Sequence, residues 1–198
     1  MSQTTQAVSA SKSKFSVRDI CYAGLFAAVI AVMAQISIPM PLGVPMTMQT
    51  FAITLAAVVL GSKLSAIATL VYLALGAVGV PVLANFSGGF DKFVGPTGGF
   101  LISFPLMAYI IGLGVEHRNA FKGAFVTAVV VGTLVNYVVG VALFVVVAHS
   151  TIAVGISACV LPFIPTAIIK AVLACAIGLN LRKLSLIHIS EPTRRTPI

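Results

Sequence analysis

Six apolar runs, separated by short stretches of prolines, glycines and charges, constrain this chain more than any other feature. They lie at about residues 18–38, 49–61, 64–80, 98–115, 121–148 and 162–181. Only 8% of the 198 residues are charged, whereas a soluble domain carries about a quarter. A bilayer accepts such an apolar surface, and helices satisfy their own backbone within it. The sequence therefore predicts an all-α integral membrane protein.

The second run raises the question of how many times the chain crosses the membrane. It would span about 20 Å at 1.5 Å per residue, less than the roughly 30 Å of the hydrocarbon core. Residues 61–63, Gly-Ser-Lys, are either a tight turn between two spans or part of one long helix. The two alternatives give six spans or five.

The distribution of basic residues favours six spans, because cytoplasmic loops are enriched in Lys and Arg. Six spans put eight basic residues inside and Lys92 alone outside, whereas five spans divide them evenly and leave Lys63 within the membrane. The eight inside are Lys12, Lys14, Arg18, Lys63, Arg118, Lys122, Arg182 and Lys183. We therefore expect six transmembrane helices with both termini in the cytoplasm.

The two ends of the chain differ in composition from the part between them. Residues 1–15 are rich in Ser, Thr, Gln and Lys, and we expect them to be disordered in the cytoplasm. Residues 185–198, SLIHISEPTRRTPI, resemble read-through at a cloning junction and are expected to be a non-native tail. The predicted membrane domain is thus residues 16–184.

Two outer loops carry the features expected of a ligand site. Three prolines make the loop at 39–48 extended and rigid, so it is a candidate lid, with Thr47 and Gln49 at its end. The loop at 85–100 holds five glycines, which permit close approach of backbone to a ligand, and Phe86, Phe90 and Phe93 in it could wall a pocket. The alternative for this second loop is a flexible connector.

Lys170 is the residue that most strongly indicates a function. It is expected within the last span, where a charge costs about 2.5–3.5 kcal/mol and needs a partner. Asp91 is the one acidic residue expected near it, and a ligand carboxylate is the second candidate partner. The alternative is that the lysine stem extends to the outer headgroups.

Small and polar residues within the spans have two interpretations each. Ala23, Ala27 and Ala31 recur every four residues on the first span, which allows close helix approach either within the chain or to a membrane partner. Asn136 is either part of a pocket or an interhelical hydrogen-bonding residue.

Several function classes are disfavoured. The sequence has no P-loop, no Ser/His/Asp set and no paired carboxylates inside the spans, so an enzyme is not expected. The three cysteines are far apart, without a CxxC pair, so no metal site is expected. Nucleic-acid binding is not expected either, because the basic residues form no stripe.

Three segments resemble one known family. The stretch GGFDKFVGPTGGFLISFP at 88–105 is similar to the glycine-rich signature of BioY proteins, the biotin-binding S components of energy-coupling factor (ECF) transporters. ISIPMPLGVPMTMQTF at 36–51 resembles their first loop, with Pro45, Thr47 and Gln49 at matching places. PFIPTAIIKA at 162–171 is similar to their P-x-x-P-x-D-x-x-K pattern and puts Lys170 at the family lysine.

This resemblance implies an S-component fold that binds biotin outside a prokaryotic cell membrane and releases it inside. It implies a transmembrane coupling subunit, docked on Ala23, Ala27 and Ala31, and two ABC ATPase subunits that use ATP, with no cofactor in this chain. Implied substrate-binding residues are Lys170 or Lys92 for the biotin carboxylate, Asn85 and Gln49 for the ureido ring, Phe86, Phe90 or Phe93 for the thiophane ring, and also Thr47 and Asp91.

Two departures from the family pattern concern the site. Ala167 stands where the pattern has aspartate, and an arginine common before the glycine pair is missing. Asp91 and Lys92 could compensate for these changes. The alternatives are an S component for another ligand, such as thiamine, riboflavin or a biotin precursor, and a membrane scaffold without a small-molecule ligand.

Overall fold

The computed structural model describes residues 16–40, 43–118 and 123–190, with side chains described as far as residue 182. The segment expected to be disordered, residues 1–15, lies outside the described residues. Of the expected non-native tail, residues 191–198 lie outside them as well.

Helices make up most of the described chain, as predicted. The main ones are α1 (Val17–Ala34), α2 (Gln49–Leu60), α3 (Ser62–Ala77), α5 (Gly98–Glu116), α6 (Ala124–Val147), α7 (Ile152–Cys159) and α8 (Ile164–Ser190). The shorter elements are β1 (Ser37–Ile38), β2 (Met46–Thr47), η2 (Ala84–Phe86), α4 (Asp91–Val94) and η3 (Leu161–Phe163).

Four helical segments in the described part are long and apolar enough to cross a membrane: Val17–Ala34, Gly98–Glu116, Ala124–Val147 and Ile152–Arg182. The apolar helices α2 and α3 are shorter. Gly61 separates these two with φ of 81°, a conformation that glycine adopts without a steric penalty. The tight turn, rather than one long helix, is therefore the correct alternative for residues 61–63.

The first and last spans differ from the predicted boundaries. Ser16 and Asp19 form a capping box that starts α1, but the helix ends at Ala34 and the chain continues into β1 instead of reaching Ile38. Helix α7 was not among the predicted spans; it precedes the last apolar run, and Pro162 and η3 separate it from α8. Helix α8 continues to Ser190, beyond the basic pair at which the span was expected to stop.

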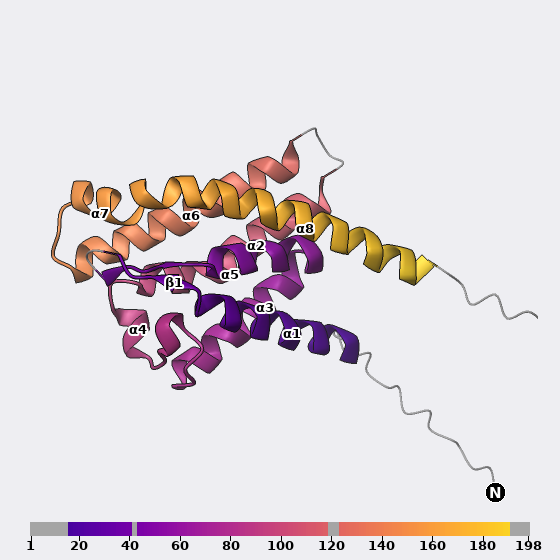
Figure 1. Cartoon of the computed structure of the whole chain (residues 1–198), viewed down its shortest axis with the longest axis horizontal. Coiled ribbons are helices and arrows are strands. Elements are labelled where there is room, and N and C mark those ends of the chain that lie inside the picture. The colour runs from indigo at the N-terminus through magenta and orange to yellow at the C-terminus, as the bar shows by residue number, and fades with distance from the viewer. Residues whose placement is uncertain (1–15, 41–42, 119–122, 191–198) are drawn as a thin grey trace, which may run out of the picture.

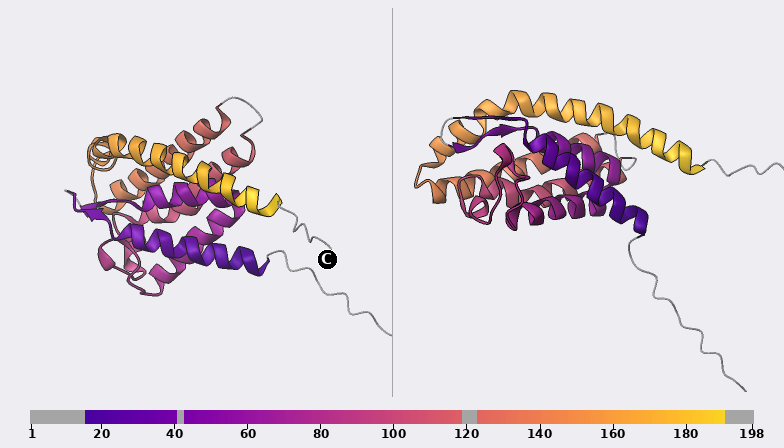
Figure 2. Two further views of the ribbon diagram at one scale, coloured as in Figure 1. Left: turned by 45° about the vertical axis from the view of Figure 1, so that its right-hand side comes forward. Right: turned by 60° about the horizontal axis from the view of Figure 1, so that its bottom comes forward.

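The helices form a bundle with two different ends (Figure 1). The start of α1 and the end of α8 lie at one end, whereas β1, α4 and α7 lie at the other, and the further views agree (Figure 2). Strands β1 and β2 pair antiparallel, with Ser37 opposite Thr47. The predicted lid segment is thus a small hairpin over one end of the bundle.

The core lies where α1, α2, α3 and α5 meet. Ile30, Ile53, Tyr72 and Ala108, one from each of these helices, are fully buried in a single cluster. Glycine permits the closest contacts: a β-carbon at Gly112 of α5 would overlap the backbone where α3 begins. These helices therefore pack in close contact at the centre of the bundle.

Candidate ligand-binding cavity

A cavity of about 370 Å³ opens between the hairpin, the segment from Leu83 to Phe104, α6 and α8. This volume lies within the roughly 300–1,000 Å³ typical of small-molecule sites. The lining residues are Gly43, Val44, Pro45, Thr47, Gln49, Thr50, Leu83, Ala84, Asn85, Ser87, Lys92, Thr97, Phe100, Leu101, Phe104, Asn136, Tyr137, Phe163, Thr166, Ala167 and Lys170. Both predicted outer loops contribute to it.

The predicted lid side chains Thr47 and Gln49 lie together at the cavity wall. Thr47 Oγ1 donates to Gln49 Oε1 over 2.7 Å, and the Gln49 amide Nε2 donates to the hydroxyl of the buried Tyr72. Gln49 is only 4% exposed. Its amide is therefore held in one orientation by neighbours from β2 and α3, which is the preorganisation that a binding site requires.

Lys170 lines the cavity from α8 and is half-buried. Its Nζ donates to the backbone carbonyl of Thr47 over 2.8 Å, so the lysine connects α8 to the hairpin. Asp91, the expected protein partner, forms an ion pair with Lys92 instead. Of the two candidate partners of Lys170, Asp91 is therefore wrong, and the ammonium keeps further donors for a ligand, because a lysine has three.

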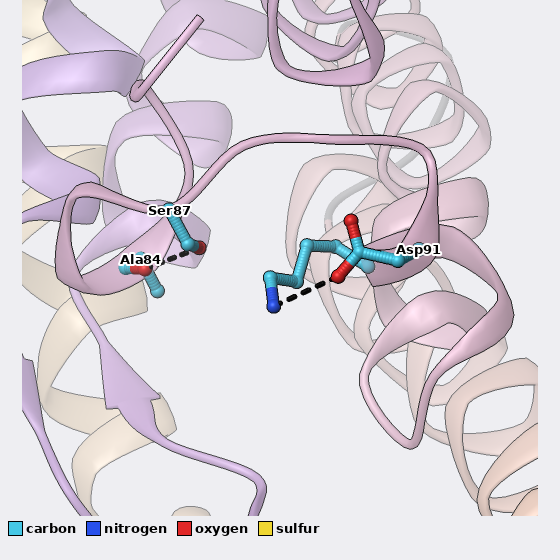
Figure 3. A network of polar contacts seen from close by, with 4 residues as sticks. Ala84, Ser87 and Asp91 are labelled. Atoms are coloured by element: carbon cyan, nitrogen blue, oxygen red, sulfur yellow. Dashed lines mark hydrogen bonds and ion pairs between the residues drawn. The ribbon is translucent and has the colours of Figure 1, made fainter. Parts of the chain in front are cut away.

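Lys92 and Asp91 lie at the edge of the cavity, on the short helix α4. The two charged groups are 2.9 Å apart (Figure 3). The hydrogen bond from Lys92 lowers the pKa of the Asp91 carboxyl, despite some opposing desolvation. Lys92 lines the cavity and Asp91 does not. Asp91 therefore orients a cavity lysine and partly neutralises it.

The predicted phenylalanine wall comes from different residues. Asn85 lines the cavity as expected, but Phe86 is 72% exposed, and neither Phe86 nor Phe93 lines it. Phe93 stacks on Phe90 at a centroid distance of 6.1 Å and packs against the core. The aromatic side chains that line the cavity are Phe100, Phe104, Tyr137 and Phe163.

Asn136 both lines the cavity and forms hydrogen bonds between helices, the two alternatives that its position in the sequence left open. Its Nδ2 donates to Ser103 Oγ over 2.8 Å and to the Phe100 carbonyl over 3.1 Å, which joins α6 to α5. The same residue is 2% exposed and lines the cavity. The sequence indicated Asn136, because a polar amide in the middle of an apolar span needs a role. It gave no sign that Phe100 and Phe104 line a cavity instead of packing against other helices.

The predicted docking stripe on α1 lies mainly inside the chain. Ala23 is 4% exposed and Ala27 is 3% exposed, both packed in core clusters, and Ala31 is partly buried against one of them. Ala23 and Ala27 are therefore corrected from partner-docking to internal packing residues. The exposed small residues on this helix are Gly24 and Ala28.

The chemistry of the lining favours a ligand with an acidic group and a ring. Lys92 and Lys170 are the charged lining residues, and no carboxylate is found among the described residues that line the cavity. Within the described part of the chain, no three His, Cys, Asp or Glu side chains form a metal-binding group. The fold and the cavity together define a helical membrane protein built to hold a small organic anion.

Comparison with known proteins agrees with this class. Residues 5–186 match the BioY family model. The biotin transporter BioY of Thermotoga maritima is 42% identical over 85% of this chain and 98% of its own length, and a probable biotin transporter BioY of Pyrococcus horikoshii is 41% identical over 83% and 96%. The chain belongs to the BioY family.

A solved structure shares the fold. The crystal structure of an S-component for biotin from an ECF-type ABC transporter superposes with a TM-score of 0.76 at 29% identity. The match covers 88% of this chain and 95% of that one. The helical arrangement around the cavity is thus that of an S component.

Proposed function

We propose that this protein captures biotin at the outer face of a prokaryotic cell membrane, as the substrate-binding subunit of an ATP-driven vitamin transporter. The family and the shared fold support this function. The observation that carries it is the position of Lys170, whose ammonium group faces the cavity without a carboxylate partner among the described residues. A ligand carboxylate would supply the missing counter-charge.

Each part of biotin has complementary groups in the cavity. The valerate carboxylate would pair with Lys170, with Lys92 as the second cation. The ureido ring needs both donors and acceptors, which the amides of Asn85 and Asn136 provide. The thiophane ring would rest against Phe100 and Phe104, whose faces are apolar. A cationic ligand such as thiamine would meet two lysines, so the charges disfavour it.

The proposed topology has six spans with both termini in the cytoplasm. The count of basic residues supports it, as does the location of the start of α1 and the end of α8 at the same end of the bundle (Figure 1). In this orientation the hairpin and the cavity face outward. The short helix α2 then crosses only part of the membrane, with the hairpin above it.

We also propose that uptake requires a transmembrane coupling subunit and two ABC ATPase subunits. Within its described residues this chain has no nucleotide site of P-loop type, so the energy would come from these partners. The coupling subunit would not dock on Ala23 and Ala27, because both are buried inside the chain. The subunit is a binding protein in this scheme and not an enzyme.

Calorimetry on the purified protein tests the binding function directly. We expect tight biotin binding that weakens roughly 100-fold in Lys170→Ala, because a charge-assisted hydrogen bond contributes about 1.5–3 kcal/mol. Lys63→Ala is the matched control, since Lys63 is exposed and far from the cavity lining. Biotin methyl ester should bind wild type as weakly as biotin binds Lys170→Ala. Equal affinities of Lys170→Ala and wild type would exclude the assigned role.

A ligand panel distinguishes the alternatives. Biotin should raise the thermal midpoint of the detergent-solubilised protein more than dethiobiotin, thiamine or riboflavin at equal concentration. Stabilisation by another vitamin would reassign the ligand, and no stabilisation by any of them would favour a scaffold. Uptake of radiolabelled biotin by an auxotrophic host, with and without the partner subunits, tests transport.

A further inference from the structure

The side chain of Gln35, at the end of α1, connects this helix to the segment at residues 82–86, almost fifty residues further along the chain. Its Nε2 lies 2.9 Å from the Ala31 carbonyl, 3.2 Å from that of Val82 and 3.1 Å from that of Leu83. Its Oε1 accepts a hydrogen bond from the Phe86 N–H over 2.7 Å. Both ends of one amide are therefore used to hold the chain between residues 82 and 86.

The segment held by Gln35 has an unusual backbone. Asn85 has φ of 58° and Phe86 has φ of 52°, in the left-handed region that bulky residues avoid. Phe86 is 72% exposed, so packing of its ring contributes little to this conformation. Such strained conformations persist only where surrounding contacts over-determine them, and they concentrate at ligand-binding sites.

Other contacts fix the two sides of this turn. The Leu83 N–H donates to the Ser87 carbonyl over 2.9 Å, and Ser87 Oγ donates to the Ala84 carbonyl over 2.7 Å (Figure 3). These bonds close the turn, and the buried Leu83 side chain packs against Gly76 of α3. Gln35 supplies the hydrogen bonds that anchor the turn to α1, and the residue presented to the cavity between the anchored positions is Asn85.

Gln35 also lies next to the other wall of the cavity. The following residue, Ile36, accepts a hydrogen bond from the Met48 N–H over 3.0 Å at the base of the hairpin. On that hairpin, Thr47 accepts the hydrogen bond from Lys170. The end of α1 is therefore the point at which the hairpin wall and the Asn85 wall meet.

We infer that Gln35 is a positioning residue for the ligand: without lining the cavity, it holds the turn at residues 82–86 so that the Asn85 side chain is preorganised for binding. This inference rests on the proposed function, because it assigns Gln35 a part in biotin affinity. The loss of the anchor releases the strained turn, and the ligand then bears the cost of ordering it.

A double-mutant cycle separates positioning from general stability, because residues that act through one another are not additive. Gln35→Met keeps the size of the side chain and removes its hydrogen bonds. We expect biotin affinity, measured by calorimetry, to fall about tenfold in Gln35→Met and about tenfold in Asn85→Ala. The double variant should be no weaker than the weaker single variant, because Gln35 acts through Asn85.

Ser65→Ala is the matched control. Ser65 is fully buried, bonds the Ala108 carbonyl between α3 and α5, and lies outside the cavity lining. It should lower the thermal midpoint without changing biotin affinity in either the wild-type or the Asn85→Ala background. If Gln35→Met does not yield folded protein, Gln35→Glu replaces it, since it keeps the acceptor for Phe86 and removes the donors.

The outcomes are distinct. Failure of the wild-type protein to bind biotin would overturn the proposed function and this inference with it. If wild type binds biotin but Gln35→Met has unchanged affinity, or if its effect multiplies with that of Asn85→Ala, the inference alone is overturned. An unchanged affinity of Asn85→Ala would overturn it as well.

Discussion

The central helix α5 and the C-terminal segment from α7 to α8 are both strongly apolar, yet they have opposite surroundings. In the most apolar 18-residue stretch of α5, 61% of the residues are buried inside the chain, whereas in that of Ile152–Arg182 only 11% are buried. Glycines bring α5 into backbone contact with its neighbours. By contrast, most of the apolar side chains described in α8, up to residue 182, are exposed on the outside of the bundle, among them Ile168, Ile169 and Val172.

This difference suggests that the central helices stabilise the fold, whereas the C-terminal segment contributes to ligand binding. The central helices pack by close contact and tolerate little change, so they carry most of the packing free energy. The C-terminal segment packs on α2 at Ala174 and Gly178 and adds a few polar links, Lys170 to the Thr47 carbonyl of the hairpin and Arg182 to the Val58 carbonyl among them. The cavity lies where the two regions meet, and one of its two lysines, Lys170, comes from the less buried region.

Substitution of Gly112 should have the largest effect. A β-carbon there would overlap the backbone of Ser62, which cannot yield as a flexible side chain does. We expect Gly112→Val to lower the free energy of unfolding by about 3 kcal/mol or more, measured by denaturant titration in mixed micelles. Gly24→Val is the control, because no atom lies within 4 Å of the added β-carbon. Equal losses in both would break the comparison.

Removal of the Lys170 charge should come second, and it should act on affinity instead of stability. Lys170→Met keeps most of the apolar stem and loses the ammonium. We expect biotin affinity to fall roughly 100-fold, about 2–3 kcal/mol, while the free energy of unfolding changes by less than about 1 kcal/mol. Calorimetry and micelle titration on the same preparation measure both. A stability loss as large as the affinity loss would mean that the two regions are not separable.

A smaller stability effect is expected at the opposite end of the bundle. Glu116 at the end of α5 accepts hydrogen bonds from Ser62 N over 2.7 Å and from Ser62 Oγ over 2.9 Å, which caps the start of α3. Glu116→Leu should cost about 1–2 kcal/mol of unfolding free energy. Glu116→Gln keeps an acceptor and should cost less. Biotin affinity should be unchanged in both, and a tenfold change would show long-range coupling to the cavity.

The smallest effect is expected at the second polar link of the C-terminal segment. Arg182 Nη1 donates to the Val58 carbonyl over 3.2 Å, and the side chain is only partly buried. Arg182→Met should lower the free energy of unfolding by about 0.5 kcal/mol and leave affinity unchanged. A loss above about 2 kcal/mol would place this segment among the regions that stabilise the fold.

The positions of the helices could be predicted from the sequence, because they depend on the residues within each segment. The boundaries of α2, α5 and α6 agree with the apolar runs to within about three residues, because a helix in lipid must satisfy its own backbone. The break at Gly61 followed from charge counting together with glycine. The contribution of the two predicted outer loops to the cavity was expected from their prolines and glycines, and five predicted site residues line the cavity: Lys170, Lys92, Asn85, Gln49 and Thr47.

The roles of several single residues could not be predicted. They depend on which side of a helix or loop faces the interior, and the spacing of residues does not decide that. Ala23 and Ala27 match a docking stripe and a packing stripe equally well, since both need small residues. Phe86 is exposed, whereas Phe100 of α5 lines the cavity, and both lie in the same glycine-rich stretch of sequence.

The sequence by itself determined that this protein belongs in a membrane, that it is helical and which family it belongs to. It also singled out Lys170 as a candidate for the cavity. Those properties follow from composition, run length and motif spacing, which do not require knowledge of neighbours in space. Only the tertiary structure decided that Lys170 pairs with the Thr47 carbonyl while Asp91 pairs with Lys92, and that Gln35 anchors the Asn85 turn. Hydrogen-bond partners tens of residues apart are chosen by the packing of whole helices, and no local pattern encodes that choice.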